Sequence, residues 1–265
     1  MMKLENIQMA DNRPLILITN DDGITASGIR TLISVMNEFG EVWVVAPDKG
    51  QSGMGHAITV DSTLHVDEVK IDDGPQKEFS CSGTPVDCVK LAISELLPRK
   101  PDLCVSGINH GSNSAINVVY SGTMSAAIEA GMEGVPSIGF SLLDFSSDAN
   151  FEPSKKYIRA IAKNTLEQGL SQGVILNVNI PALEEEDIKG VKICRQAKAT
   201  WEEEFEKRID PRGRTYYWLT GKFVNLDKGK DTDEWALENG YVSVVPVHYD
   251  LTEYSAIQQL NTWDL

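Results

Sequence analysis

Apolar runs separated by amphipathic stretches fill the first two-thirds of the chain. The first run, LILIT at residues 15–19, is continuous and rich in β-branched residues, which is typical of a strand buried on both faces of a sheet. Similar apolar runs predict further strands at residues 41–47, 102–108, 137–142 and 174–181, and shorter strands are expected in STLHVDEVKI and KEFSCSG.

Helical patterns lie between these runs. A helix is expected to follow the first strand and to stop at Gly40. Another is expected with Thr84 as its N-cap, Pro85 at its first position and Asp87 closing a capping box. Two more are expected in TMSAAIEAGMEG and over residues 153–169. This alternation predicts an α/β fold: a Rossmann-like, doubly wound, mostly parallel sheet with helices on both faces.

The pattern changes after about residue 195. Residues 200–222 have the pattern of two extended arms around a turn at 210–213, with charges and aromatic rings too dense for an ordinary core hairpin. We therefore divide the chain into an α/β catalytic domain, residues 1–195, and a C-terminal arm with a final strand and a tail helix, residues 196–265. The hairpin is either a subunit contact, or a lid or solvated hairpin on its own chain, and the residues alone favour neither interpretation.

The composition of the chain limits the classes of binding partner that are expected. The 265 residues include 24 Lys and Arg against 39 Asp and Glu, a formal charge of −15, so no nucleic-acid partner is expected. Residues 1–13 lack the apolar core of a secretory signal, and no apolar run approaches the roughly 20 residues of a membrane span. The four cysteines form no CxxC pair. Reduced thiols in a cytoplasmic protein without a membrane partner are therefore expected.

Candidate chemistry lies in the loops after the strands. Asp21 and Asp22 directly follow the first strand, Ser52 lies in a Gly-rich loop after the second, and Asn109 follows the strand at 102–108. These loops should gather on one rim, because ligands bind beyond the carboxyl ends of parallel strands. Two adjacent carboxylates repel each other unless a positive charge lies between them. Oxygen ligands of this kind suit Mg²⁺ or Mn²⁺.

Each of these features also has a simpler interpretation. An Asp-Asp-Gly sequence after a strand is commonly loop chemistry or a cap, and a Gly-rich run can be a plain connection. The Ser-Gly-Thr sequence at 121–123 is an adequate helix cap without any ligand, and His56 and His110 are ordinary loop residues. No single feature identifies a site, but their convergence on one rim favours one.

The chain resembles the survival protein E (SurE) nucleotidases over nearly its whole length. The resemblance rests on motifs in the family's order and spacing: ILITNDDGITASGI, VVAPDKGQSGMGHAIT, CSGTPVDCVKLAI, VSGINHGSN, YSGTMSAAIEAG, WLTGKF and YVSVVPVHYDLT. It implies a divalent-metal-dependent phosphatase that hydrolyses nucleoside monophosphates. It also implies a homodimer or homotetramer with exchanged C-terminal arms, which favours the subunit-contact interpretation of the hairpin.

The resemblance also implies the site residues, with one Mg²⁺ or Mn²⁺ per subunit held by Asp21, Asp22, Ser52 and Asn109. His110 stands where some members of the family have Arg. Asp21 and Asp22 are the expected catalytic residues, and Asp21 is the better candidate for a base or nucleophile because it follows the strand directly. The substrate phosphate is expected to contact Asn109, Ser121, Gly122 and Thr123, with Thr123 also capping the helix.

Other classes of protein fit less well. A dinucleotide-binding dehydrogenase would carry G-x-G-x-x-G after the first strand, where this chain has NDDGITASG. A phosphatase that forms an aspartyl-phosphate usually carries Asp-x-Asp there. A non-catalytic sensor of metal and nucleotide would use the same rim and stays open. The sequence also leaves open the preferred base, sugar, phosphate position and metal, and whether 3′-nucleotides or short polyphosphate are cleaved.

Overall fold

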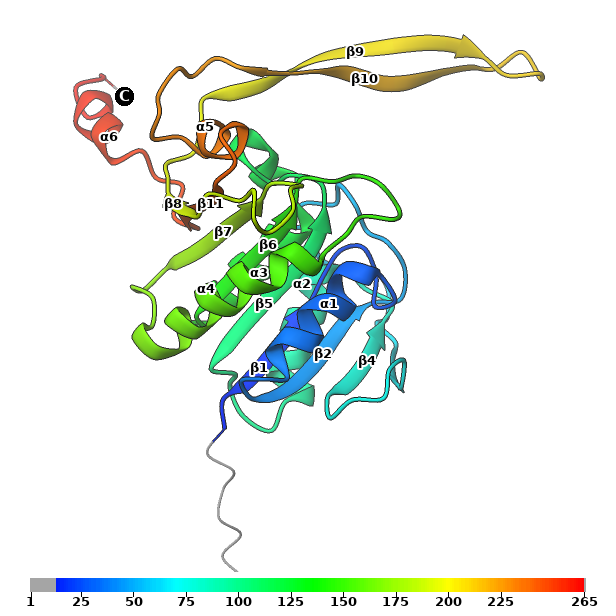
Figure 1. Cartoon of the computed structure of the whole chain (residues 1–265). Coiled ribbons are helices and arrows are strands. Elements are labelled where there is room, and N and C mark those ends of the chain that lie inside the picture. The colour runs from blue at the N-terminus through cyan, green and yellow to red at the C-terminus, as the bar shows by residue number, and fades with distance from the viewer. Residues whose placement is uncertain (1–12, 265) are drawn as a thin grey trace, which may run out of the picture.

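The computed structural model describes residues 13–264 (Figure 1). The sequence predicts no secretory signal in residues 1–13. Almost all of these residues, 1–12, lie outside the described part of the chain. Within the described part of the chain, no helix is long and apolar enough to cross a membrane. The four cysteines are buried and free, in agreement with the expected reduced thiols.

A nine-stranded sheet forms the centre of the molecule, in the order β3-β4-β2-β1-β5-β6-β7-β11-β8. All neighbours are parallel except β3 against β4 and β11 against β7. The predicted Rossmann-like, mostly parallel sheet is therefore confirmed. The strands are β1 (Leu15–Thr19), β2 (Glu41–Pro47), β3 (Val66–Val69), β4 (Lys77–Cys81), β5 (Leu103–His110), β6 (Ser137–Leu142), β7 (Val174–Ile180), β8 (Val191–Ile193) and β11 (Val242–His248).

Both faces of the sheet are covered, which explains the unbroken apolar runs of its inner strands. In β1 every residue is buried: Ile16 and Ile18 join the core under helices α1 (Ser27–Met36) and α4 (Lys155–Gln168), and Leu17 joins the core on the opposite side. That second core lies under α2 (Pro85–Leu91) and α3 (Gly122–Met132). Successive residues of a strand point to opposite faces, so the run must be apolar throughout.

The ends of the helices follow the predicted signals only in part. The capping box of α2 is present, with the Thr84 side chain accepting from Asp87 N–H and the Asp87 side chain accepting from Thr84 N–H. Helix α1 ends at Met36, so Gly40 is not its stop. Gly40 is required by close approach instead, because a Cβ there would lie 2.1 Å from the Pro14 carbonyl oxygen.

Short helical segments complete the body of the protein. A π-helical turn, η1 (Ala92–Leu96), continues α2. Two 3₁₀ turns precede longer helices, η2 (Ala115–Val119) before α3 and η3 (Glu152–Ser154) before α4. Helix α5 (Asp233–Glu238) precedes β11, and α6 (Tyr254–Leu260) lies close to the C-terminal end.

A separate antiparallel ribbon, the arm, extends away from this body (Figure 1). It consists of β9 (Ala199–Ile209) and β10 (Thr215–Asn225), paired with each other along their whole length and with no other strand. The predicted hairpin is thus confirmed, with arms slightly longer than expected. The final strand, β11, returns to the body and pairs with β7 and β8.

Candidate functional site

Two neighbouring strands and one helix bring the predicted site residues together. Asp21 and Asp22 follow β1, and Asn109 is the next-to-last residue of the adjacent strand β5. The Thr123 hydroxyl, in the first turn of α3, donates to Asp21 Oδ1 at 2.5 Å and lies 3.4 Å from Asn109 Oδ1. The backbone N–H of His110 donates to Asp22 Oδ2 at 3.2 Å. The expected convergence at the carboxyl ends of the strands is therefore observed for these residues.

Asp21 is the most strongly perturbed acid of the site. Its side chain is buried, with the residue 4% exposed. Burial raises its pKa to about 6; the hydrogen bond from Thr123 opposes this rise, and the charge of Asp22 adds to it. Among the described residues, neither Asp21 nor Asp22 pairs with a Lys or Arg, and only His110 Nδ1 lies near Asp22, at 3.2 Å. The site therefore carries an excess of negative charge.

Asn109 is oriented by its own neighbours. Its amide Nδ2 donates to the carbonyl oxygens of His110, at 3.1 Å, and Gly111, at 2.8 Å. Because the amide nitrogen is fixed on that side, the carbonyl oxygen Oδ1 is turned toward Thr123 and so toward Asp21. An oxygen acceptor, rather than an N–H donor, thus faces the carboxylates, which is the arrangement a cation would require.

Ser52 lies on an exposed loop that is anchored on both sides. Before it, the Gln51 N–H donates to the Asp21 carbonyl at 2.7 Å. After it, His56 Nε2 meets the buried carboxylate of Glu129 at 2.7 Å, and the Thr84 hydroxyl donates to the Ala57 carbonyl at 2.7 Å. Ser52 itself makes no side-chain hydrogen bond to another described residue. Its loop is held beside Asp21, while its role as a ligand stays a prediction.

The first turn of α3 corrects one prediction. Ser121, not Thr123, is the N-cap: its side chain accepts from Met124 N–H at 3.0 Å, and its backbone is extended. Thr123 lies inside the helix and bonds Asp21. Gly122 packs directly on the acid, since a Cβ there would lie 2.8 Å from Asp21 Cβ. A Ser-Gly-Thr sequence offers two hydroxyls near one helix end, and only the tertiary position of Asp21 separates their roles.

A buried amide network supports this region and was missed in the sequence. Asn113 N–H donates to Asn179 Oδ1 at 2.8 Å, Asn177 Nδ2 donates to the Asn113 carbonyl at 2.8 Å, and Asn113 Nδ2 donates to Ser141 Oγ at 2.8 Å. These bonds fix the segment between β5 and α3 on strands β6 and β7. The two Asn in VILNVNIP, an otherwise apolar strand, were the available signal, because buried amides require partners.

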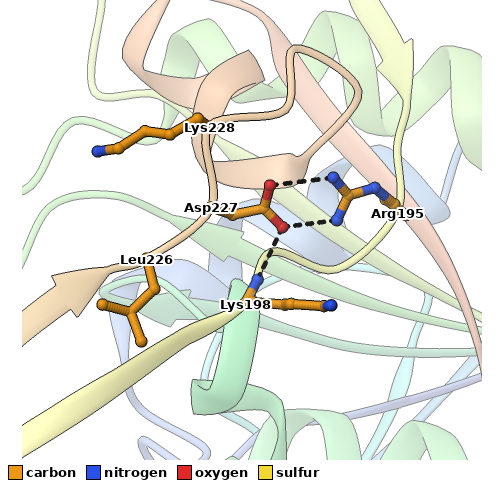
Figure 2. Close-up of a pocket in the computed structure, with 5 residues that line it drawn as sticks. All are labelled: Arg195, Lys198, Leu226, Asp227 and Lys228. Carbon is orange, nitrogen blue, oxygen red and sulfur yellow. Dashed lines mark hydrogen bonds and ion pairs between the residues drawn. The ribbon is translucent and has the colours of Figure 1, made fainter.

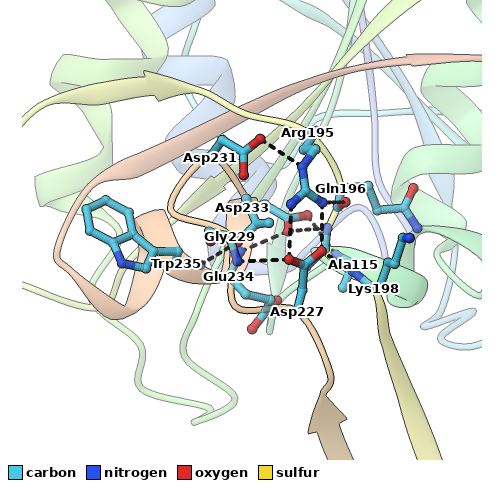
Figure 3. Close-up of polar contacts among 12 residues, drawn as sticks. Ala115, Arg195, Gln196, Lys198, Asp227, Gly229, Asp231, Asp233, Glu234 and Trp235 are labelled. Carbon is cyan, nitrogen blue, oxygen red and sulfur yellow. Dashed lines mark hydrogen bonds and ion pairs between the residues drawn. The ribbon is translucent and has the colours of Figure 1, made fainter.

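A second polar cluster ties the base of the arm to the same segment (Figure 3). Asp233 is fully buried and accepts from the N–H groups of Ala115 and Ala197, each at 2.8 Å. Ala115 begins η2 beside the site, and Ala197 lies just before β9. One carboxylate therefore joins the start of the arm to the loop that leads to α3.

Arg195, which lies before β9, and Asp227, which lies after β10, form an ion pair at the base of the arm (Figure 2). The guanidinium contacts the two Asp227 oxygens at 2.7 and 3.0 Å, and Lys198 N–H donates to the same carboxylate at 3.2 Å. The Arg195 bond holds the pKa of Asp227 well below its usual range. These residues line an open hollow of about 540 Å³. The Arg195–Asp227 pair therefore joins the chain before β9 to the chain after β10, as a structural joint.

The expected metal site consists of mixed oxygen ligands and not of a cluster of acidic residues. No group of three or more His, Cys, Asp or Glu within residues 13–264 is placed to hold a metal ion. The expected set differs from such a cluster, since it combines two carboxylates with the neutral oxygens of Ser52 and Asn109. The unneutralised charge at Asp21 and Asp22 suits that set.

The fold and the site define a Rossmann-like α/β protein with an acidic, oxygen-rich site beside a helix N-terminus, at the edge where such sheets bind phosphorylated ligands. The family model described as "Survival protein SurE" matches residues 16–203. The chain belongs to the SurE family, as the sequence motifs predicted.

Similar proteins support this over the full length. A "5′-nucleotidase SurE" of Christiangramia forsetii is 67% identical and covers 97% of this chain and 99% of its own. A "5′-nucleotidase SurE" of Flavobacterium psychrophilum is 66% identical and covers 96% of this chain and 99% of its own. The crystal structure of the SurE protein from Aquifex aeolicus is 41% identical, with a TM-score of 0.81 over 94% of this chain and 98% of that one. The fold is therefore that of a known SurE protein.

Proposed function

We propose that this chain is a 5′-nucleotidase that hydrolyses nucleoside 5′-monophosphates to nucleoside and phosphate, using one divalent cation per subunit, Mg²⁺ or Mn²⁺. The name shared by its relatives supports the reaction. The observation that carries the site is the buried Asp21 carboxylate, with a pKa raised to about 6, beside Asp22 and against the first turn of α3.

The residues present fit a hard cation. Asp21, Asp22, Ser52 and Asn109 would hold it, since all offer oxygen and since Asn109 turns its carbonyl oxygen toward the acids. When bound, the cation would neutralise phosphate charge and lower the pKa of a water molecule toward neutrality. This local positive charge is needed because the chain as a whole carries −15.

The chain's own residues orient the phosphate. The N-terminus of α3 presents backbone N–H groups with a favourable dipole, and Gly122 lets it approach Asp21 closely. Ser121 keeps its hydroxyl proton available, because its oxygen only accepts the cap bond from Met124. Thr123 orients Asp21, which acts as base or nucleophile. Asn109, Ser121, Gly122 and Thr123 remain the proposed phosphate contacts.

The test is phosphate release from AMP by the purified protein, with Mn²⁺, with Mg²⁺ and with chelator. Metal-dependent hydrolysis supports the proposal, and the same assay with 3′-nucleotides and short polyphosphate defines the range of substrates. Metal-dependent binding of AMP without any release would instead identify the non-catalytic sensor. An exposed acid outside the site offers a matched control, Asp61→Asn, which removes one charge without touching the proposed ligands.

We also propose that the arm joins subunits into a homodimer or homotetramer. Cross-strand pairing places Trp201, Phe205, Ile209, Tyr217, Leu219 and Phe223 on one face of the ribbon, and the other face carries most of its Glu residues. Most of the apolar side chains on that face are exposed, with Phe205 at 62% and Ile209 at 67%. An apolar face of this size on a ribbon without a core is typical of a protein interface.

A further inference from the structure

A hollow of about 520 Å³ lies between the base of the arm and the residue that precedes the proposed phosphate contacts. Its aromatic and apolar walls are Tyr120, from the end of the η2 segment, and Trp201 and Leu219, from the two strands of the arm. The arm residues Glu203, Thr220 and Gly221 complete the lining. Both aromatic residues are about half exposed, Tyr120 at 52% and Trp201 at 42%. Aromatic surface therefore faces solvent beside the active site.

The Trp201 ring is held in place before any ligand arrives. Its Nε1–H donates to Asn117 Oδ1 at 2.8 Å, and its ring meets Phe223 edge to face with centroids 5.6 Å apart. Gly221 lies on the same face of the ribbon, between Leu219 and Phe223, and adds no side chain to the hollow. A fixed ring beside an open space is a preorganised surface for a flat ligand.

One wall of the hollow is adjacent in the chain to the proposed phosphate contacts. Tyr120 is joined by one peptide bond to Ser121, the N-cap of α3. The loop that carries Ser52 also comes close, since a Cβ on Gly55 would lie 3.4 Å from the Val119 carbonyl oxygen. A nucleotide whose phosphate lies at the start of α3 must extend its sugar and base away from the helix. The aromatic hollow is a surface available to that base, because Tyr120 directly precedes the N-cap Ser121.

We propose that the hollow is a nucleobase subsite, in which the base of the nucleotide stacks on Tyr120 and Trp201; this rests on the proposed nucleotidase function. Every base has a flat π-face, so stacking accepts different bases and favours the larger purines. The subsite thereby gives the arm a second role, since one of its residues contacts substrate while its outer part stays available to a partner subunit.

The experiment compares substrates with and without a base, AMP and ribose 5-phosphate, in steady-state assays with Mn²⁺. Tyr120→Ala and Trp201→Ala should each raise the KM for AMP roughly ten-fold, within the range found when an aromatic platform is removed from a stacked base. The kcat for AMP and both constants for ribose 5-phosphate should stay near the wild-type values. Tyr120→Phe, which keeps the ring, should restore the KM for AMP.

Matched controls separate stacking from changes in the arm. Trp218→Ala removes a more exposed ring from the opposite face of the ribbon, and Asn117→Ala removes the Trp201 hydrogen bond but keeps both rings. Light scattering on each variant reports its assembly. If Trp201→Ala changes the mass, Tyr120→Ala, which lies outside the arm, decides the question.

The outcomes distinguish the subsite from the function on which it rests. If the variants weaken AMP and ribose 5-phosphate equally, or if wild-type protein shows the same KM for both, the subsite is wrong and the nucleotidase function stands. If the wild type releases phosphate from neither substrate with any metal, the function itself fails. A selective loss for AMP, reversed by Tyr120→Phe, supports the subsite.

Discussion

Strand β1 and the arm are both extended, yet they depend on different support. Every residue of β1 is buried between two layers of helices, whereas nearly every residue of β9 and β10 is exposed. In β1 burial on both faces dictates each side chain and fixes the place where Asp21 and Asp22 emerge. In the arm, alternation creates an apolar face that the rest of the described chain contacts only at its base, through Trp201, and otherwise leaves uncovered.

The difference shows where each region obtains its stability. An isolated two-stranded ribbon is marginal in water, because it buries little apolar surface for the entropy that it loses. The joint of Arg195 and Asp227 fixes only its base. The Arg195 side chain is 44% exposed, so solvent screens its pair with Asp227 and the pair adds only a modest amount of energy. The body should therefore be stable alone, and the arm should depend on a partner subunit.

The largest expected effect follows from removing the arm. Deleting residues 201–223 should convert the assembly to a monomer in light scattering, because the apolar face is lost. The monomer should still melt at a higher temperature with Mn²⁺ than with chelator, since the proposed ligands all lie in the body. If the deletion variant keeps the same number of subunits as the wild type, the arm is a lid and does not depend on a partner subunit.

The second effect lies in the body, at Asp22. Asp22→Asn keeps an acceptor for the His110 N–H but removes one of the two charges that would hold the proposed cation. Activity should fall at least about 1,000-fold, since one lost charge-stabilising contact already costs roughly 100- to 1,000-fold. Added Mn²⁺ should no longer raise the melting temperature. Wild-type turnover in this variant would contradict the metal site.

Local signals predicted the body well. The apolar runs place the strands because burial on both faces leaves a clear pattern, and the α2 capping box lies within four consecutive residues. The rim of Asp21, Asp22 and Asn109 followed from the rule for parallel sheets.

Features that depend on distant residues were not predictable in the same way. The bond from Thr123 to Asp21 joins residues 102 positions apart, and the Asn113–Asn179 bond joins residues 66 apart. The sequence also could not show that Gly40 serves close packing rather than a helix end, because Gly suits both. The amphipathic faces of the arm became visible only once its register was known.

A pH-dependent effect comes from Asp21. Its pKa rises from 3.8 to about 6 on folding without metal, so the folded protein binds more protons than the unfolded chain between these values. Stability from this group therefore falls as pH rises through that window. The shift corresponds to about 3 kcal/mol. In chelator, Asp21→Asn should match the wild type near pH 4 and exceed its unfolding free energy by up to about 3 kcal/mol at pH 7.

Chemical denaturation across this pH range measures the effect. Asp61→Asn, at an exposed position, controls for the loss of a charge as such. With saturating Mn²⁺ the wild type should instead be more stable than Asp21→Asn, because only the wild type keeps the Asp21 carboxylate as a proposed metal ligand. A stability difference that does not change with pH would show that the pKa of Asp21 is not raised in the folded protein.

The smallest effect concerns two hydroxyls in the first turn of α3. Ser121→Ala should lower the unfolding free energy by about 1 kcal/mol through loss of the cap, equally at pH 5 and pH 8, because no charge is involved. Thr123→Ala removes a donor that lowers the pKa of Asp21, so this pKa should rise further. Its destabilisation in chelator should therefore grow as Asp21 ionises with rising pH. Denaturation of both variants at the two pH values decides the matter, and a loss independent of pH in Thr123→Ala would show that the Thr123 hydroxyl does not hold down the pKa of Asp21.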